Sequence, residues 1–395
     1  MSTDFDELTQ RRGTNSYKWD SADDPDVIAM WVADMDFKTA PCITRALQRR
    51  IEHGIFGYTR VPTSYYDAVC QWFSRRHHWQ ISPGDIIYTT GVVPALSAVI
   101  KALTLPGDQV IVQGPVYNCF YSSIRNNGCE AVSNALIYDT QTHSYRMDLA
   151  DLDQKLAHPR ARLMLLCNPH NPGGRVWTPQ ELTDVATLCE RHGVRLVSDE
   201  IHGELTLRDH MYTPVGTLPG RLGGNAIVCC SPTKAFNIAG LQIANIVCKD
   251  AEARERIGRA ININEVCDVN PLGVEALMAA YSAEGEQWLD ELRAYLTANY
   301  ELARQHFAAH MPSCHVAEME GTYLAWVDCS ALGVPSAEIE RHLLRTQKVW
   351  INAGPLYGKE GEGFIRINMA CPRPRLTEGL RRITDGLKQL FTPQA

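Results

Sequence analysis

The sequence predicts an α/β fold with a mostly parallel central sheet, followed by a smaller α+β domain. Between about residues 84 and 250, short apolar runs alternate with longer segments of helical periodicity. This alternation is typical of parallel strands joined by helical crossovers. The last third of the chain instead combines long helices with a few separate strands. We therefore expect a large domain over residues 46–284 and a small domain built from residues 1–45 together with 285–395.

Five apolar runs are predicted to be strands buried on both faces of the sheet. They are VIVQ (110–113), RLMLLC (162–167), VRLVS (194–198), AIVCC (226–230) and IANIV (243–247). Between two of them, residues 178–193 predict a helix, because Thr178 can cap it, Pro179 suits its first turn and Glu181 completes a capping box. Gly193 is expected to end this helix.

The C-terminal part is predicted from the same periodicities. We expect one long amphipathic helix over residues 273–308 and shorter helices near 336–346 and 374–391. Strands are expected at 322–328, 348–352 and 363–368. Ligands usually bind between such domains and at the carboxyl ends of parallel strands, so the binding site is expected there.

The composition is that of a soluble globular protein. The 395 residues are 45% hydrophobic and 21% charged, which excludes a disordered or fibrous chain. The formal net charge is -7 and the charges are scattered, so nucleic-acid binding is not indicated. The N-terminus lacks an apolar signal segment, and no run approaches the ~18 apolar residues of a membrane span. These features predict a cytoplasmic protein without membrane contact.

The thirteen cysteines indicate buried, reduced thiols rather than a disulfide or metal framework. Their number is odd, no CxxC pair occurs, and several lie within apolar runs. Cys229 and Cys230 are neighbours on a predicted strand, so they should point to opposite faces of the sheet. His306 and His310 lack the intervening glutamate of a metalloprotease helix and are expected to be exposed helix histidines. No metal site is predicted.

Three polar residues follow predicted strands, and their order along the chain suggests a cofactor-binding site. Asn171 lies in NPHNPGGR, Asp199 in SDEIH and Lys234 in SPTKAFNIAGLQ. A lysine at such a place can form an imine with an aldehyde cofactor, and an aspartate can hold a protonated pyridine nitrogen. Asn171 could donate its amide to the phenolic oxygen of the same ring. Each residue alone could be an ordinary turn or surface residue, but the three strand ends together favour a cofactor site.

With these motifs, the chain resembles the fold-type I enzymes that use pyridoxal 5'-phosphate, the aspartate aminotransferase superfamily. The matching motifs are NPxNPxGR, SDEIH and SxxK. Within that superfamily the chain looks like the MalY/PatB subfamily of cystathionine β-lyase-type C-S lyases, and the similarity extends over nearly its whole length. The segments that carry it are WVADMDFKTAPCI (31–43), FGYTR (56–60), PVYNCFY (115–121), residues 189–205, TKAFNIAGL (233–241) and FIRINMACPR (364–373).

The resemblance assigns roles around the cofactor ring. It implies that Lys234 binds the cofactor covalently and carries protons, that Asp199 holds the pyridine nitrogen, and that Asn171 contacts the phenolic oxygen. Tyr117 of PVY is expected to stack on the ring. His202 matches a further neighbour of the phenolic oxygen, although a helix cap or a structural histidine is the alternative.

The cofactor phosphate is expected at the start of a helix. In TTGVVPALSAVI (89–100) a strand leads into a helix, where the backbone N–H groups of Gly91, Val92 and Val93 could bind a dianion. Ser231 would add a hydroxyl. Tyr58 matches a family tyrosine that reaches the phosphate in the neighbouring subunit, which implies a homodimer with shared active sites. An ordinary turn aromatic is the alternative for Tyr58.

Arg366 in FIRIN is the candidate for the substrate carboxylate, because a planar guanidinium holds a carboxylate at two points. It could equally be the solvent-facing residue of a half-buried strand. The loop that contains Asp34 and Met35 is expected to line the same pocket through its backbone. Gln242 stands where aspartate-type aminotransferases carry a phosphate-binding arginine, a departure that MalY-like lyases share.

The resemblance therefore implies a pyridoxal-phosphate-dependent C-S β-lyase. It would convert L-cystathionine or other cysteine S-conjugates into a thiol such as homocysteine, pyruvate and ammonia. A class I/II aminotransferase is the alternative, since both reactions begin with the same removal of a Cα proton. A second role is also conceivable, because MalY-type proteins can bind a transcription activator, but no feature of the sequence identifies such a partner surface.

Overall fold

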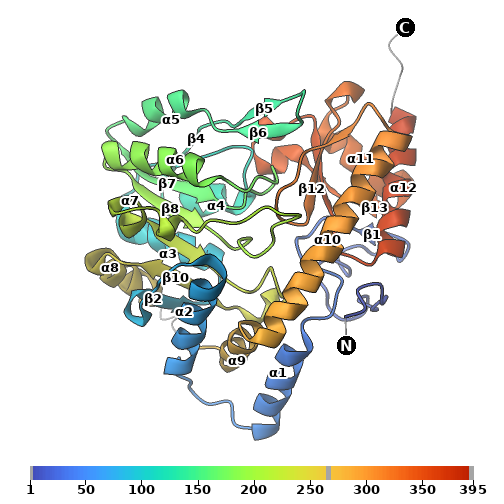
Figure 1. Cartoon of the computed structure of the whole chain (residues 1–395). Helices are drawn as coiled ribbons and strands as arrows, with labels where there is room; N and C mark the ends of the chain where they lie inside the picture. The colour runs from blue at the N-terminus through green and yellow to red at the C-terminus, as the bar shows by residue number, and fades with distance from the viewer. Residues whose placement is uncertain (1–2, 264–267, 391–395) are drawn as a thin grey trace.

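The computed structural model describes residues 3–263 and 268–390, and its larger part is built around a seven-stranded sheet (Figure 1). β10 runs antiparallel to both of its neighbours, and the remaining pairs are parallel. This confirms the predicted α/β fold with a mostly parallel sheet. In sheet order the strands are β2 (Ile86–Thr89), β10 (Ala244–Cys248), β9 (Ile227–Cys230), β8 (Arg195–Asp199), β7 (Ala161–Cys167), β3 (Gln109–Val112) and β4 (Glu130–Ser133).

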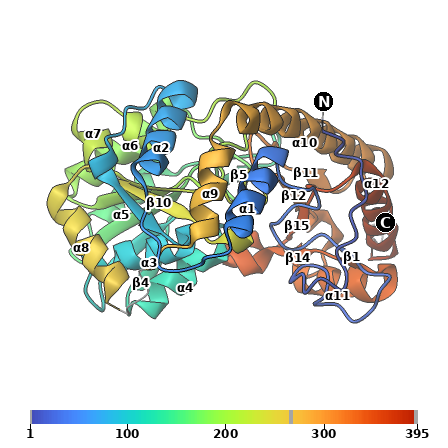
Figure 2. The same cartoon turned by 90° about the horizontal axis from the view of Figure 1, so that it is seen from below.

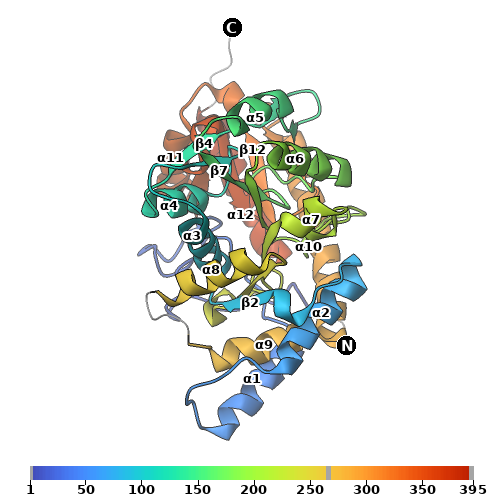
Figure 3. The same cartoon turned by 90° about the vertical axis from the view of Figure 1, so that its left-hand side faces the viewer.

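Helices cover both faces of this sheet (Figure 3). One apolar cluster joins it to α3 (Val92–Leu103), α4 (Asn118–Asn126) and α8 (Ala251–Asn262). The opposite cluster contains buried side chains of α2 (Thr63–His77), α5 (Leu149–Leu156) and α6 (Pro179–Arg191). Cys229 belongs to the first cluster and Cys230 to the second, so these neighbours point to opposite faces as predicted.

Most of the elements predicted by residue range are present, but two separate helices were predicted as one. The predicted helix over 273–308 consists of α9 (Pro271–Ala280) and α10 (Ala283–His310). The break lies at Ser282, whose hydroxyl accepts a hydrogen bond from the backbone N–H of Gly285 at 3.2 Å. A serine in this position satisfies a free N–H group at a helix start, so it begins a new helix instead of continuing the old one.

The smaller part contains a four-stranded antiparallel sheet, seen from another side in Figure 2. Its strands, in sheet order, are β11 (His315–Val316), β12 (Leu324–Asp328), β15 (Phe364–Asn368) and β14 (Asn352–Ala353). The predicted strand 348–352 is wrong as a single element, because Val349 and Trp350 form β13, which pairs with β1 (Ile28–Ala29) instead. Helices α11 (Ser336–Gln347) and α12 (Arg373–Leu390) pack together beside this sheet.

The remaining elements connect these parts. Helix α1 (Pro41–His53) packs against α9, and the long α10 extends from α9 to the smaller part (Figure 1). The domain limits at residues 45 and 285 stay a prediction, and the second one falls in the first turn of α10. The larger part also contains a short helix α7 (Arg221–Asn225) and a hairpin of β5 (Ile137–Asp139) and β6 (Ser144–Arg146). The predictions made from the sequence do not include this hairpin, β1, β4 and β11, or α1 and α2.

The described cysteines are free thiols, most of them buried, while Cys267 lies outside the described residues. His306 is half-buried and shares a 3.0 Å hydrogen bond with the Thr384 hydroxyl, so it is less exposed than expected, whereas His310 is exposed. No group of three potential metal ligands gathers in the described ranges. None of the helices described combines the length and apolar character that a membrane crossing requires.

Candidate active site

A cavity of about 200 Å³ lies at the carboxyl ends of β7, β8 and β9. The parallel register sets Cys167 beside Asp199 and Asp199 beside Cys229, so these strands end at the same edge of the sheet. The loops that follow them therefore converge. Of the residues predicted from sequence, those that line the cavity are Gly91, Val92, Val93, Tyr117, Asn171, Asp199, His202 and Lys234.

Lys234 faces this cavity rather than the outer surface. Burial, together with the positive charge of Arg366, lowers the pKa of its amine to about 8. Its Nζ donates a hydrogen bond to the backbone oxygen of Ala33, which also accepts one from the Tyr323 hydroxyl at 2.9 Å. The uncharged form that a nucleophile or base requires is thus about a tenth of the amine at pH 7, far more than for an ordinary lysine.

Asp199 is a buried acid at the cavity wall, with only 3% of its surface exposed. Burial raises the pKa of its carboxyl to about 7, although one carboxylate oxygen accepts a hydrogen bond from the N–H of Ile201 at 3.1 Å. In the described part of the chain this carboxylate has no ion-pair partner within bonding distance. A cationic group in the cavity would supply the missing counter-charge, which suits the protonated pyridine nitrogen that the sequence predicted.

His202 is a neutral imidazole beside the same cavity. Burial, reinforced by the charges of Lys234 and Arg366, lowers the pKa of its ring to about 3. Its Nδ1 has no hydrogen-bond partner among the described residues, and the same holds for Nε of Arg366. Buried polar atoms normally have partners, so the free Nδ1 of His202 at the cavity, and the free Nε of Arg366 beside the cavity-lining Asn171, indicate that a polar ligand completes the site.

The first turn of α3 borders one end of the cavity through Gly91, Val92 and Val93. No side chain caps this helix start, which leaves backbone N–H groups and the positive end of the helix dipole available to an anion. Ser231 is placed less directly, because its hydroxyl donates to the backbone oxygen of Ile243 at 2.6 Å. Thr233, which the sequence analysis did not select, lines the cavity instead, and a contact between Ser231 and the phosphate stays a prediction.

Arg366 projects from β15 toward the loop after β7. Its Nη1 donates to Oδ1 of Asn171 at 3.1 Å and its Nη2 donates to the backbone oxygen of Trp31 at 2.9 Å. Its guanidinium carbon lies 4.6 Å from the centre of the Tyr357 ring. Because Arg366 is only 4% exposed, the alternative of a solvent-facing arginine does not apply. Neither Tyr357 nor Trp31 had been selected from the sequence.

Besides Ser231 and Arg366, three predicted site residues lie outside the cavity wall. Ala33 is the residue of its loop that lines the cavity, whereas Asp34 forms an ion pair with Arg11 at 2.8 Å. Met35 is buried, and its N–H donates to Oδ1 of Asn237 at 3.0 Å. Tyr58 is 98% exposed in the segment between α1 and α2. Roles for Asp34, Met35 and Tyr58 in binding stay predictions.

The residues present fit pyridoxal phosphate. The cavity offers an amine on Lys234, a buried carboxylate on Asp199 and a helix start for the phosphate, and within residues 3–263 and 268–390 neither the carboxylate has a counterion nor the helix start a side-chain cap. Tyr117 lines the same space as the predicted stacking partner of the ring. Gln242, which replaces the arginine of aspartate-type enzymes, also lines the cavity.

The sequence and the fold are similar to those of known proteins over nearly their full length. Residues 25–383 match the family described as aminotransferase class I and II. The chain is 41% identical to cystathionine beta-lyase PatB of Bacillus subtilis (97% of this chain, 99% of the relative) and 34% identical to protein MalY of Escherichia coli (98% and 99%). It is also 30% identical to a PLP-bound C-S lyase of Staphylococcus hominis in complex with L-cycloserine, with a TM-score of 0.91 and 98% of each chain covered. The chain therefore belongs to the aminotransferase class I and II family and, within it, to the MalY/PatB group of cystathionine β-lyase-type proteins.

Proposed function

We propose that the protein is a pyridoxal-phosphate-dependent C-S β-lyase that acts on L-cystathionine or other cysteine S-conjugates. The observation that carries this proposal is that Lys234, Asp199 and Asn171 line one cavity, and that Arg366 donates a hydrogen bond to Asn171. The names of the relatives agree with it, because PatB is a cystathionine beta-lyase and the Staphylococcus hominis structure is a PLP-bound C-S lyase.

Some residues of the site bind the substrate and the cofactor, and Lys234 transfers the proton. When bound, pyridoxal phosphate supplies an aldehyde for the substrate amine and a ring that accepts the electron pair left at Cα. Arg366 binds the substrate α-carboxylate, with Asn171 fixing the orientation of its guanidinium at 3.1 Å. The carboxylate of Asp199 would pair with the protonated ring nitrogen of the bound cofactor, and that positive charge would favour the ionised carboxylate although burial raises its pKa. Binding of the carboxylate by Arg366 holds the Cα–H bond of the substrate in a fixed orientation before the Cα proton is removed.

Lys234 is the base that takes the proton from Cα of the substrate. Its lowered pKa of about 8 allows it to accept that proton near neutral pH. The Cβ–S bond then breaks and the sulfur leaves as a thiolate, which gives a thiol such as homocysteine. The three-carbon fragment that remains is released and hydrolyses to pyruvate and ammonia.

The test is the product balance without any added oxo acid. The holoenzyme incubated with L-cystathionine should release pyruvate and a free thiol in equal amounts, measured by a coupled reduction of pyruvate and by a thiol reagent. Lys234→Ala should release neither, while Lys155→Ala, which removes an ammonium that is remote from the cavity on α5, should behave as the wild type. A strict requirement for an oxo acid would instead identify an aminotransferase.

We further propose that the enzyme is a homodimer in which Tyr58 enters the active site of the other subunit. Support comes from the segment around Tyr58, where Ile51, Ile55 and Phe56 are also more than half exposed. Large apolar side chains clustered on a surface are typical of an interface. Lys234→Ala and Tyr58→Ala should each be inactive, and mixed dimers of the two should regain activity because one of their sites is intact. A monomeric mass in solution, or no recovery on mixing, would contradict this proposal.

A cytoplasmic location and a regulatory protein partner are the remaining proposals. Free thiols at the described cysteines favour a reducing compartment, which cell fractionation can test. For the partner role, a pull-down with Lys234→Ala separates binding from catalysis. Capture of a transcription activator by this variant would support the role, and its absence from the eluate would argue against it.

A further inference from the structure

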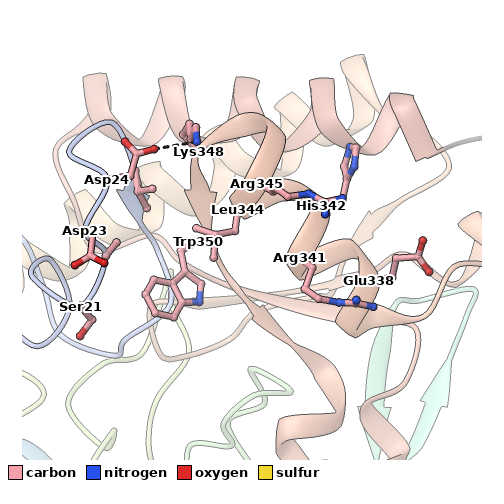
Figure 4. A pocket seen from close by; sticks show the side chains of 12 residues that line it. Ser21, Asp23, Asp24, Glu338, Arg341, His342, Leu344, Arg345, Lys348 and Trp350 are labelled. Carbon is pink, nitrogen blue, oxygen red and sulfur yellow. Dashed lines mark ion pairs between the residues drawn. The ribbon is translucent and has the colours of Figure 1, made fainter.

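A second and larger cavity, of about 850 Å³, opens on the smaller part of the molecule (Figure 4). It lies between the N-terminal segment around Ser21–Val27 and helix α11, and its floor includes Trp350 of β13. It shares no lining residue with the active-site cavity. Its volume falls in the range of sites for small molecules, roughly 300–1,000 Å³.

One wall of this cavity carries two arginines without carboxylate partners. Arg341 and Arg345 lie one turn apart on α11 and are both exposed. Neither forms an ion pair with a carboxylate in the described ranges, whereas the neighbouring Lys348 pairs with Asp24 at 2.9 Å. Nε of Arg341 donates to the backbone oxygen of Ala337 at 3.1 Å, so its Nη groups and the guanidinium of Arg345 are available to an added anion. Arg is the side chain best shaped to hold a carboxylate.

The floor of the cavity is a fixed aromatic surface. One face of the Trp350 indole is stacked on Trp31, with ring centres 4.3 Å apart and planes within 11°. Its ring N–H donates to Oε1 of Glu340 at 3.3 Å, which limits rotation of the ring. Val27 and Leu344 add apolar surface beside it. A planar apolar group that packs here would need little reorganisation of the protein.

The charged side chains that line this cavity favour a ligand with a single negative charge over a polyanion. In Figure 4, Asp23 lies on one side of Trp350, and Arg341 and Arg345 lie on the other. Glu338 also belongs to the lining. The acidic side chains would repel a polyanion such as a nucleotide triphosphate, whereas a single negative charge held at the arginines avoids most of that repulsion.

We propose that this cavity binds a small monocarboxylate with a planar apolar body. The carboxylate is held by Arg341 and Arg345, and the body lies on the free surface of Trp350. This site is separate from the amino-acid site at Arg366, and it does not require the proposed lyase activity.

Calorimetric titration of the holoenzyme tests the proposal with phenylpropionate as the probe. This compound has the ring and the carboxylate but no amine, so it cannot react as an amino acid at the active site. Its matched control is phenylpropylamine, which keeps the ring and reverses the charge. We expect saturable binding of phenylpropionate, no binding of phenylpropylamine, and weaker binding of inorganic phosphate.

Variants of the lining residues show where phenylpropionate binds. The double variant Arg341→Gln/Arg345→Gln, and separately Trp350→Leu, should weaken phenylpropionate binding by at least roughly tenfold. Arg304→Gln removes an exposed arginine on α10 outside the cavity and should leave binding unchanged. Arg366→Gln should also leave it unchanged. Loss of binding only in Arg366→Gln would place the carboxylate in the active site and overturn the proposal. Equal binding of the amine, tighter binding of phosphate, or no saturable binding would overturn it as well.

Discussion

The surroundings of Lys234 change the acid–base chemistry of its side-chain amine. Because burial and the nearby Arg366 both disfavour a second positive charge, the pKa of the amine falls from its usual 10.5 to about 8. Below that pH the amine is largely protonated and cannot attack an aldehyde. Above it the neutral form dominates.

The rate at which the apoprotein takes up pyridoxal phosphate should therefore rise with pH, with a midpoint near 8. The measurement is the growth of the cofactor's visible absorbance after mixing. Arg366→Gln removes a neighbouring positive charge, so its midpoint should move to higher pH, whereas Arg304→Gln on the outer surface should not move it. A wild-type midpoint close to that of free lysine would contradict this explanation.

We expect Tyr357 to affect substrate binding through Arg366, the proposed partner of the substrate carboxylate. Its ring lies under the guanidinium, and its hydroxyl accepts a hydrogen bond from Nδ2 of Asn352 at 2.9 Å. A cation–π contact in a desolvated site contributes about 1–2 kcal/mol. Tyr357→Leu should accordingly raise KM about tenfold with a smaller effect on kcat, while Tyr357→Phe keeps the ring and most of the affinity. Steady-state kinetics with L-cystathionine test this, and an equal loss of kcat in both variants would argue against a positioning role.

The site residues that follow strands could be predicted from the sequence. The residues that contact them and hold them in place could not. Asn171, Asp199 and Lys234 follow apolar runs, and a parallel sheet brings such ends together. Tyr357 and Tyr323 give no comparable signal, because an aromatic residue far along the chain is equally suited to any core. Their positions depend on which segments meet in the folded chain.

Among the elements, α6 illustrates how local sequence can define a helix end. The Thr178 hydroxyl accepts from the N–H of Glu181 at 3.2 Å, and the Glu181 carboxylate accepts from the N–H of Thr178 at 2.8 Å. Both contacts were predicted from residues three positions apart.

Thr178→Ala should therefore destabilise the protein by about 1 kcal/mol, because it leaves N–H groups of the first turn without acceptors. A lower unfolding temperature in thermal denaturation would show this. Thr187→Ala is the matched control, since this exposed hydroxyl only donates to the backbone oxygen of Thr183 one turn earlier. Equal unfolding temperatures for the two variants would exclude a capping contribution.

The two wrong predictions of secondary structure, the single helix 273–308 and the single strand 348–352, have a common physical origin. The apolar periodicity continues from α9 into α10, so the pattern alone could not show that the chain breaks at Ser282. Likewise, the predicted strand 348–352 has one apolar pattern but covers parts of β13 and β14, which pair with different strands: β13 with β1 near the N-terminus, and β14 with β15, the next strand along the chain. Periodicity reports which face of an element is buried, and it does not report which strand is the partner.

At the scale of the whole molecule, the N-terminal segment is attached through a buried carboxylate. Asp36 forms ion pairs with Arg11 at 2.9 Å, with Lys18 at 3.1 Å and with Arg375 of α12 at 3.0 Å. Burial alone would raise the pKa of Asp36, but the charges of Lys18 and Arg375 and a hydrogen bond from Trp19 outweigh it and lower the pKa below 3.8. The cluster joins segments more than three hundred residues apart in the sequence.

Asp36→Asn should destabilise the molecule by roughly 3–5 kcal/mol, because it leaves buried cations without their counter-charge. A carboxylate with a depressed pKa stabilises the fold above its unfolded-state pKa, and this contribution is lost as the pH falls through its folded-state pKa. The difference in unfolding temperature between wild type and variant should thus be full at neutral pH and shrink below about pH 4. Asp385→Asn, on the exposed surface of α12, is the control and should have little effect at any pH. A difference that persists undiminished in acid would rule out this electrostatic origin.

The sequence by itself determined the α/β class, the mostly parallel sheet and the three strand ends that carry Asn171, Asp199 and Lys234. These follow from local patterns, since burial on both faces and turn chemistry are written in neighbouring residues. Only the tertiary structure decided how Arg366 is held, that Asp199 has no counterion among the described residues, and that a second cavity opens beside Trp350. These features depend on contacts between distant segments and on the exclusion of water, which no local pattern specifies.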